Sequence, residues 1–448
     1  MKEKLKFFSK IRRVLTIVGI FCGLSLANAV SSANYIPPVP GKITIVASTL
    51  VPPGCDYTSA DFERAKDCGF NTTFIEAGVN KMAQIVKEAA NSGMHIILSN
   101  GVTSNGDPNS KDYQVRLDNL IKECSGYKSV AGYYFSDEPS WESLPALKKR
   151  YDFFQQILNK YNSRQFIFLN LVGVEKNKNY NPGMDYSTYV DHIAEMFRPP
   201  FLSFDVYPIV RFPRALRYTV KYEDYYRDFA ALAAMREKYG IPFWSYCMTM
   251  EHSNTQGYYQ PRPTEGYLRF EAFTALAYGA QGILYWTYTQ RPSNDLETYL
   301  SAPIDLNGNK TKTWDRVRNV NMDIHAFNDV FFNAVPLKCV HTGKIAAKVK
   351  PAGYTSAEAS KEKLPNVKIT AQKDGVLISH LKNGEKRYIV MVNQSPFKSQ
   401  KIKFYLERDF KYQEYTASNG NLKITDLPSG KQSRKLQAGD ILVLEYSK

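Results

Sequence analysis

Short apolar runs alternate with amphipathic stretches along most of the chain. The apolar, β-branched runs predict eight strands, at residues 43–49, 72–77, 95–100, 130–136, 165–172, 202–207, 242–250 and 282–288. The stretches that follow them have helical periodicity and predict eight helices, at residues 59–68, 81–91, 113–124, 142–161, 186–196, 223–239, 265–278 and 313–332. Nearly continuous apolar strands separated by amphipathic helices indicate a parallel sheet that is covered on its outside.

Eight strand–helix units of this size predict an α/β protein with a closed (β/α)8 barrel, over residues 34–335. The alternative is a doubly wound open sheet, which normally has a glycine-rich phosphate loop after its first strand. Here the residues at that place are Ser48-Thr49-Leu50-Val51-Pro52-Pro53. The pattern therefore favours the barrel.

The pattern changes after Val335. Helical periodicity gives way to short alternating runs at residues 367–370, 376–381, 388–393, 401–406 and 441–446. The pair Asn383-Gly384 between two of these runs is a strong hairpin signal. Several strands at this spacing predict an antiparallel β-sandwich domain over residues 336–448.

Residues 1–33 have the features of a signal peptide. A basic stretch ends at Arg13, an apolar run follows, and Ala27-Asn28-Ala29 offers a small-x-small cleavage site. The apolar run is short for a membrane span. We therefore expect export to the periplasm, the cell surface or the medium. A lipid anchor at Cys22 is disfavoured, because Phe21 stands where a small residue is needed.

Composition excludes several function classes. The formal net charge is +15, and the excess suits an acidic glycan, an anionic surface or simply a solvated face. No nucleic-acid-binding motif accompanies it, so we expect no nucleic-acid partner. Cysteine-x-x-cysteine pairs are absent and the six histidines are scattered, so neither a metal site nor another cofactor is expected. No partner protein is implied, and the oligomeric state stays open.

The residues that close the predicted strands carry the candidate chemistry, because reactive groups of such barrels sit at the C-terminal ends of the strands. Carboxylates, amides and aromatic rings dominate there. They are Glu76, Asn100, Asp137, Glu138, Asn170, Asp205, Tyr207, Glu251, Trp286 and Tyr288. Two carboxylates that flank a glycosidic bond, with rings and amides around them, are typical of carbohydrate hydrolysis.

The most specific segment is Gly-Tyr-Tyr-Phe-Ser-Asp-Glu-Pro-Ser-Trp at residues 132–141. Pro139 cannot continue a strand ladder, so it fixes the exit of the chain and leaves Glu138 at the rim. Asp137 and Glu138 would also suit the N-terminus of the next helix. Because Ser140 can cap that helix, we favour a catalytic role for Glu138.

This segment and the barrel resemble the retaining glycoside hydrolases of clan A. Those enzymes carry an acid/base glutamate after the fourth strand, so the resemblance implies this role for Glu138. They usually read Asn-Glu-Pro at this place, whereas this chain has Asp137-Glu138-Pro139. The usual asparagine binds the 2-hydroxyl of the sugar, and Asp137 would make that contact with a different charge.

The resemblance also implies a nucleophile at the end of the seventh strand, where this chain has Glu251. Asp205, which closes the sixth strand, is the rival for that role. Tyr207 would orient the nucleophile and Trp286 would lie beneath the sugar. The remaining expected substrate contacts are Asn100, Trp141, Asn170 and Tyr288.

The expected function is therefore hydrolysis of a poly- or oligosaccharide with retention of configuration. Export, aromatic richness and the second domain are similar to polysaccharide-degrading enzymes of Bacteroidetes, and an endo-β-glucanase is one candidate. A non-catalytic carbohydrate-binding protein on the same barrel is the alternative. Whether cleavage is internal or terminal stays open.

Overall fold

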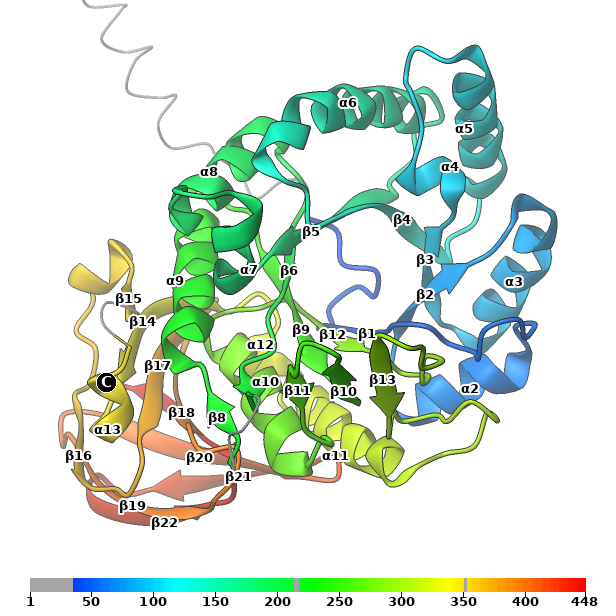
Figure 1. The fold of residues 1–448 in the computed structure, drawn as a ribbon. Coiled ribbons are helices and arrows are strands. Elements are labelled where there is room, and N and C mark those ends of the chain that lie inside the picture. The colour runs from blue at the N-terminus through cyan, green and yellow to red at the C-terminus, as the bar shows by residue number, and fades with distance from the viewer. Residues whose placement is uncertain (1–34, 213–216, 350–352) are drawn as a thin grey trace, which may run out of the picture.

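The fold is that of a computed structural model, which describes residues 35–212, 217–349 and 353–448 (Figure 1). The predicted signal peptide and Cys22 lie outside the described residues. Within the described part of the chain, no helix is both long and apolar enough to span a lipid bilayer.

Eight parallel strands close into a barrel around which helices form an outer ring (Figure 1). The strands are β1 (Thr44–Ala47), β2 (Thr72–Glu76), β3 (His95–Ser99), β4 (Val130–Asp137), β5 (Phe166–Val172), β6 (Leu202–Asp205), β9 (Phe243–Met248) and β12 (Gly282–Trp286). Each barrel strand pairs with the next barrel strand along the chain, and β12 pairs with β1 to close the ring. The barrel is confirmed and the open sheet is excluded.

The barrel helices follow their strands as the periodicity predicts. They are α2 (Ser59–Asp67), α3 (Val79–Ser92), α5 (Lys111–Cys124), α6 (Leu144–Lys160), α8 (Tyr186–Phe197), α9 (Tyr222–Tyr239), α10 (Glu265–Ala277) and α11 (Lys312–Ala326). Shorter helices stand in the connections, at α4 (Gly101–Ser104), α7 (Val174–Tyr180) and α12 (Asn328–Phe331). Of these, α7 holds a residue that matters for the site.

Aromatic side chains fill the interior of the barrel. The rings of Phe201 and Trp244 stack with centroids 3.8 Å apart, and Phe166 and Phe168 pack around them. The indole N–H of Trp244 donates to the hydroxyl of Tyr35, 3.2 Å away. A filled interior leaves only the ends of the barrel to hold a substrate.

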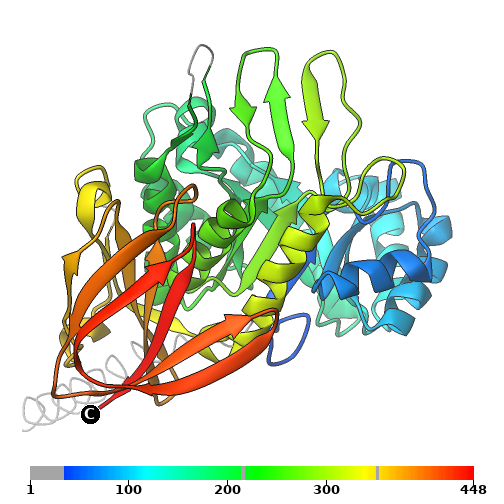
Figure 2. The same ribbon diagram turned by 90° about the horizontal axis from the view of Figure 1, so that it is seen from below.

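Short hairpin strands extend the loops at one end of the barrel (Figure 2). They are β7 (Ile209–Val210), β8 (Thr219–Val220), β10 (Glu251–Asn254), β11 (Tyr259–Gln260) and β13 (Glu297–Leu300). Because β10 follows β9 and β7 follows β6, this is the end at which the barrel strands finish. The hairpins form a wall beside the mouth.

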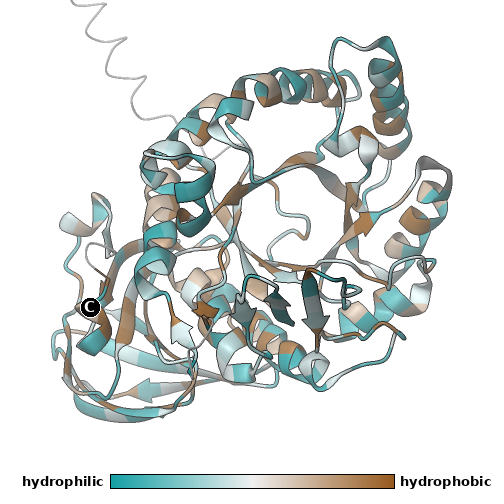
Figure 3. Ribbon diagram, in the orientation of Figure 1, coloured by the Kyte–Doolittle hydropathy of each residue, from teal (hydrophilic) through white to brown (hydrophobic). Residues whose placement is uncertain are grey.

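The C-terminal domain is a sandwich of two antiparallel sheets, as predicted. The larger sheet holds β14 (Val335–His341), β15 (Tyr354–Thr355), β17 (Val376–Asn383), β18 (Lys386–Asn393), β20 (Lys411–Ser418), β21 (Asn421–Leu427) and β23 (Ile441–Ser447). The smaller sheet holds β16 (Val367–Ala371), β19 (Gln400–Leu406) and β22 (Gly430–Leu436). The apolar faces of both sheets pack into one core. In Figure 3 the strands of this domain show both hydrophobic (brown) and hydrophilic (teal) residues.

Helix α10 lies between the barrel and the sandwich and is buried on nearly all sides. An ordinary surface helix buries only one stripe, whereas α10 packs against β9 on one side and against β17 and β18 on the other. A Cβ added to Gly266 would lie 2.6 Å from Ala438 and 2.7 Å from the carbonyl oxygen of Pro396. The two domains are therefore in close contact across this helix.

Arg269 of α10 makes two close ion pairs, one within the barrel and one that joins the barrel to the sandwich. Its guanidinium lies 2.7 Å from a carboxylate oxygen of Asp323 in α11 and 2.7 Å from one of Asp440 in the sandwich. We expect Arg269→Leu to lower the free energy of unfolding by about 3–5 kcal/mol, because it leaves buried carboxylates unpaired. Urea unfolding measures this. Arg116→Leu, which removes an exposed pair with Asp112, is the control and should cost under about 1 kcal/mol. Equal losses would contradict the prediction.

Candidate active site

Neighbouring strands β4, β5 and β6 bring three polar side chains together at the mouth of the barrel. In the strand register Asp137 lies beside Asn170, and Val172 of the same strand lies beside Asp205. The side-chain nitrogen of Asn170 donates to Asp137 Oδ1 at 2.9 Å and to Asp205 Oδ1 at 3.1 Å. The amide oxygen accepts from the Ser203 hydroxyl at 3.0 Å. Asn170 therefore holds two carboxylates in fixed positions.

Glu138 follows directly and adds a third carboxylate. Its backbone N–H donates to the carbonyl oxygen of Asn170 at 2.9 Å, which anchors it beside β5. Its φ angle is +42°, in the left-handed region that side chains other than glycine, asparagine and aspartate seldom adopt. Such a conformation costs on the order of 1–3 kcal/mol and is concentrated at functional sites. The chain thus accepts backbone strain to place this carboxylate.

Lys176 reaches these carboxylates from helix α7. Its Nζ lies 2.5 Å from Glu138 Oε1 and 3.5 Å from Asp205 Oδ2. Burial lowers the pKa of the Lys176 ammonium, but Asp205 and Glu138 outweigh that effect and raise the pKa overall. The lysine is therefore charged, and it neutralises part of the negative charge of the cluster.

The start of α7 is held by a buried acid from another helix. The backbone N–H of Val174 donates to Asp228 Oδ1 at 2.8 Å, and Asp228 on α9 is fully buried. A carboxylate at a helix N-terminus is a favourable partner for the unpaired N–H groups there. This contact fixes the helix that carries Lys176.

The cluster holds a proton near neutral pH. Burial raises the pKa of Asp205, the charge of Lys176 opposes this and the negative charge of Glu138 adds to it, so that the pKa is about 7. Only 12% of the Asp205 side chain is exposed. Two carboxylates that share one ammonium and one proton are the arrangement expected of an acid/base site.

Aromatic rings line the mouth beside the cluster. Tyr207 and Trp286 stack with centroids 6.1 Å apart and an interplanar angle of 29°. Trp286 also lines a cavity of about 450 Å³, together with Glu76, Tyr134 and Tyr246. Asp137 and Glu138 line a second hollow of about 620 Å³. Glu138 therefore lies next to open space that a saccharide can enter.

Glu251 lies apart from this cluster. It begins strand β10, where His252 faces Trp286 with ring centroids 6.1 Å apart. Because successive side chains of a strand point to opposite faces, Glu251 points to the other face. There it accepts a hydrogen bond from Tyr259 and lies 3.6 Å from Arg262. No ion pair or hydrogen bond within the described ranges joins it to Glu138, Asp205 or Lys176.

The other three predicted substrate contacts lie in different surroundings. Asn100 caps α4, accepting from the N–H groups of Val102 and Thr103. Trp141 packs on His192 with ring centroids 4.4 Å apart. Tyr288 is fully buried, and its hydroxyl accepts from the Trp314 indole. We therefore leave Tyr288 out of the proposed site, because a ring in the core cannot touch a substrate.

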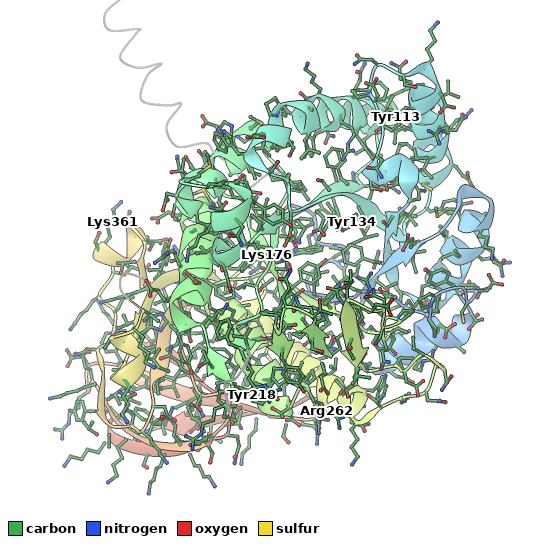
Figure 4. All side chains as sticks on the ribbon, in the orientation of Figure 1. Tyr113, Tyr134, Lys176, Tyr218, Arg262 and Lys361 are labelled. Carbon is green, nitrogen blue, oxygen red and sulfur yellow. The ribbon has the colours of Figure 1, made fainter. Side chains whose placement is uncertain are left out.

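The sequence pattern missed Lys176. It lies in a seven-residue helix, too short to show clear periodicity, and charged residues in such a loop usually face solvent. The available signal was its position, four residues after the end of β5 and therefore at the catalytic end of the barrel. Figure 4 labels Lys176 near helix α7 and Tyr134 inside the ring of barrel strands.

Comparisons with known proteins find similarity to glycoside hydrolases. Residues 144–327 match the family model of glycoside hydrolase family 42, described as beta-galactosidase. A comparison with curated proteins gives no sequence match.

Two solved structures share the fold. A beta-galactosidase from Bacillus circulans sp. alkalophilus has a TM-score of 0.65 at 10% identity, covering 91% of this chain and 99% of its own. A catalytic mutant of a family 42 beta-galactosidase from G. stearothermophilus has a TM-score of 0.61 at 10% identity, covering 92% and 99%. At this identity the two structures establish the barrel with its C-terminal domain, while the family model relates the chain to glycoside hydrolases.

The raised pKa of Asp205 makes stability depend on pH. The folded protein keeps a proton on Asp205 up to about pH 7, whereas the unfolded chain loses it near pH 4, so the stabilising proton is lost as pH rises. We expect Asp205→Asn to stabilise the protein more at pH 8 than at pH 5, by on the order of 2–3 kcal/mol. Urea unfolding at both pH values measures this. If Asp205→Asn changed the free energy of unfolding by the same amount at both pH values, the prediction would be wrong.

Proposed function

We propose that this protein, a glycoside hydrolase of clan A by its family match and its barrel, hydrolyses β-galactosides with retention of configuration. The observation that carries the proposal is the carboxylate pair Glu138 and Asp205 at the mouth of the barrel, with Lys176 between them. The preference for galactose rests on the description of the family that matches residues 144–327. A β-glucan is the second substrate to test.

The separation of the pair supports retention. Because Lys176 Nζ is 2.5 Å from one carboxylate oxygen and 3.5 Å from the other, these two oxygens cannot be as far apart as the roughly 6.5–9.5 Å that inverting enzymes need. Retaining enzymes hold their carboxyl groups about 5–5.5 Å apart. The pair is therefore better suited to direct attack than to activation of a water on the opposite face.

In the first step Glu138 donates a proton to the leaving oxygen as the glycosidic bond breaks, and a second carboxylate bonds to the anomeric carbon. In the second step Glu138 takes a proton from water, whose oxygen displaces that carboxylate. Before the first step the shared proton must be on Glu138, and Lys176 must move away from Oε1. Lys176 is half-exposed, so its flexible side chain is free to do so.

The nucleophile in this proposal is Asp205, with Glu251 as the rival. Asp205 lies beside the acid, on the strand that leads to Tyr207, and Lys176 and Asn170 orient it. Glu251 has the position in the chain order that the clan A resemblance implies, but its side chain is engaged by Tyr259 and Arg262. Asp137 and Asn170 remain the proposed contacts for sugar hydroxyls, and Trp286 the surface beneath the ring.

Removing the acid should affect substrates unequally. Glu138→Gln keeps the shape of the side chain but has no proton to give, so we expect turnover of alkyl galactosides to fall by roughly 10²–10⁴-fold. Aryl galactosides with strongly acidic leaving groups need no proton and should lose far less in the first step. Steady-state kinetics on both classes measures this. Equal losses on both would remove Glu138 from the role of acid.

A covalent trap identifies the nucleophile. We expect a 2-fluoro-β-galactosyl fluoride to inactivate the enzyme and to label Asp205, because Asp205 shares Lys176 with the acid. Peptide mapping by mass spectrometry locates the label. Label on Glu251 would transfer the role to that residue, and inverted product stereochemistry would rule out a covalent intermediate. If no glycan in a broad panel releases reducing sugar, the protein is the non-catalytic carbohydrate binder instead.

A further inference from the structure

The smaller sheet of the C-terminal domain has an unusual charge pattern. Strands β16, β19 and β22 read VKITA, QKIKFYL and GKQSRKL, with six basic residues and no acidic one. Alternate positions point into the core, and the positions between them point to solvent. The exposed lysines on the solvent side, here named the lysine face, are Lys368, Lys401, Lys403, Lys431 and Lys435.

The register places these lysines next to one another. Lys401 lies directly opposite Lys435, and Lys368 and Lys431 lie on either side of Tyr405. Directly opposite side chains have Cβ atoms about 4.5–5.5 Å apart, and like charges in such pairs are destabilising. The fold gains nothing from this arrangement.

The charges of the lysine face are not neutralised within the chain. The ion pairs of the sandwich involve other groups, such as Arg434 with Glu414 and Lys386 with Glu445. Over the described ranges, none of the five lysines lies within ion-pair distance of a carboxylate. Arg434 is on the same strand as two of them but points to the opposite side of the sheet and is paired there. Of the two sides of the smaller sheet, the side that faces solvent therefore keeps its positive charge.

We propose that the lysine face binds an acidic polysaccharide through its carboxylate or sulfate groups. On β19, Lys401 and Lys403 are two residues apart, about 6.6–6.8 Å, and on β22 two lysines are four residues apart, about 13 Å. Such spacing suits a linear polymer that carries charges at intervals. The half-buried ring of Tyr405 lies among them and offers an apolar surface to a pyranose. This site is separate from the mouth of the barrel and does not depend on the proposed reaction.

A polymer suits this face better than a lipid surface. Proteins that lie on membranes combine basic residues with large apolar side chains that enter the acyl region. The outward positions of the three strands are lysine, threonine, serine, alanine and one tyrosine. The face can therefore attract anions but has little to insert.

The experiment compares two variants with the same change in charge. The first replaces the five lysines of the lysine face with glutamine. The control replaces five exposed lysines of the barrel with glutamine, namely Lys87, Lys111, Lys122, Lys128 and Lys149. Calorimetric titration at low salt uses polygalacturonate for carboxylates, dextran sulfate for sulfates and neutral β-1,3-glucan as the uncharged polymer. Vesicles with and without anionic phospholipid form the last arm.

We expect the lysine-face variant to bind at least one of the two polyanions about tenfold more weakly than the control variant, with a loss of salt dependence. Comparison of the two polyanions decides between carboxylate and sulfate. Equal binding by both variants, or binding of anionic vesicles but of neither polyanion, would overturn the proposal. Thermal unfolding and hydrolysis of a small aryl galactoside should match between the variants. Failure of that hydrolysis in the unaltered protein would count against the proposed function and not against this site.

Discussion

Repulsion among carboxylates at adjacent strand ends is the constraint on which the site depends. Three acids, Asp137, Glu138 and Asp205, converge where β4 and β6 finish, and no such cluster is stable unless its charge is reduced. One amide, one ammonium and one retained proton do this. Asn170 bridges Asp137 and Asp205, and Lys176 bridges Glu138 and Asp205. The balance that makes the cluster tolerable also leaves a movable proton beside an open cavity.

The rest of the fold keeps that cluster in place. Stacked rings fill the barrel below it, so the strands that carry Asn170 and Asp205 cannot shift relative to each other. Asp228 fixes the start of the helix that carries Lys176. Farther away, α10 is packed between the barrel and the sandwich, which braces the strand that precedes the β10 hairpin. Packing far from the site thus helps to fix the positions of the polar side chains.

Periodicity predicted the barrel because every strand is apolar and every covering helix is amphipathic. It also placed Asp137, Asn170 and Asp205 at one end, since strand ends in a parallel barrel share a side. Periodicity could not predict the direction in which individual side chains point. Glu251 lies past the end of β9, and its orientation depends on how β10 pairs with β11 and β13.

Other differences have similar causes. Tyr288 lies two residues after the end of β12, where the chain has already turned back into the core. Strands β20, β21 and β22 escaped prediction because many of their positions are polar, and a polar run does not identify a strand. In β22 two of these polar residues, Lys431 and Lys435, belong to the lysine face.

The left-handed backbone at Glu138 has a consequence for how the sequence can change over time. Glycine or asparagine would relieve the conformation at that position, so a chain selected only to fold would drift toward them. Either change would also remove the carboxylate that pairs with Lys176. At this position a relaxed backbone and a carboxylate therefore exclude each other.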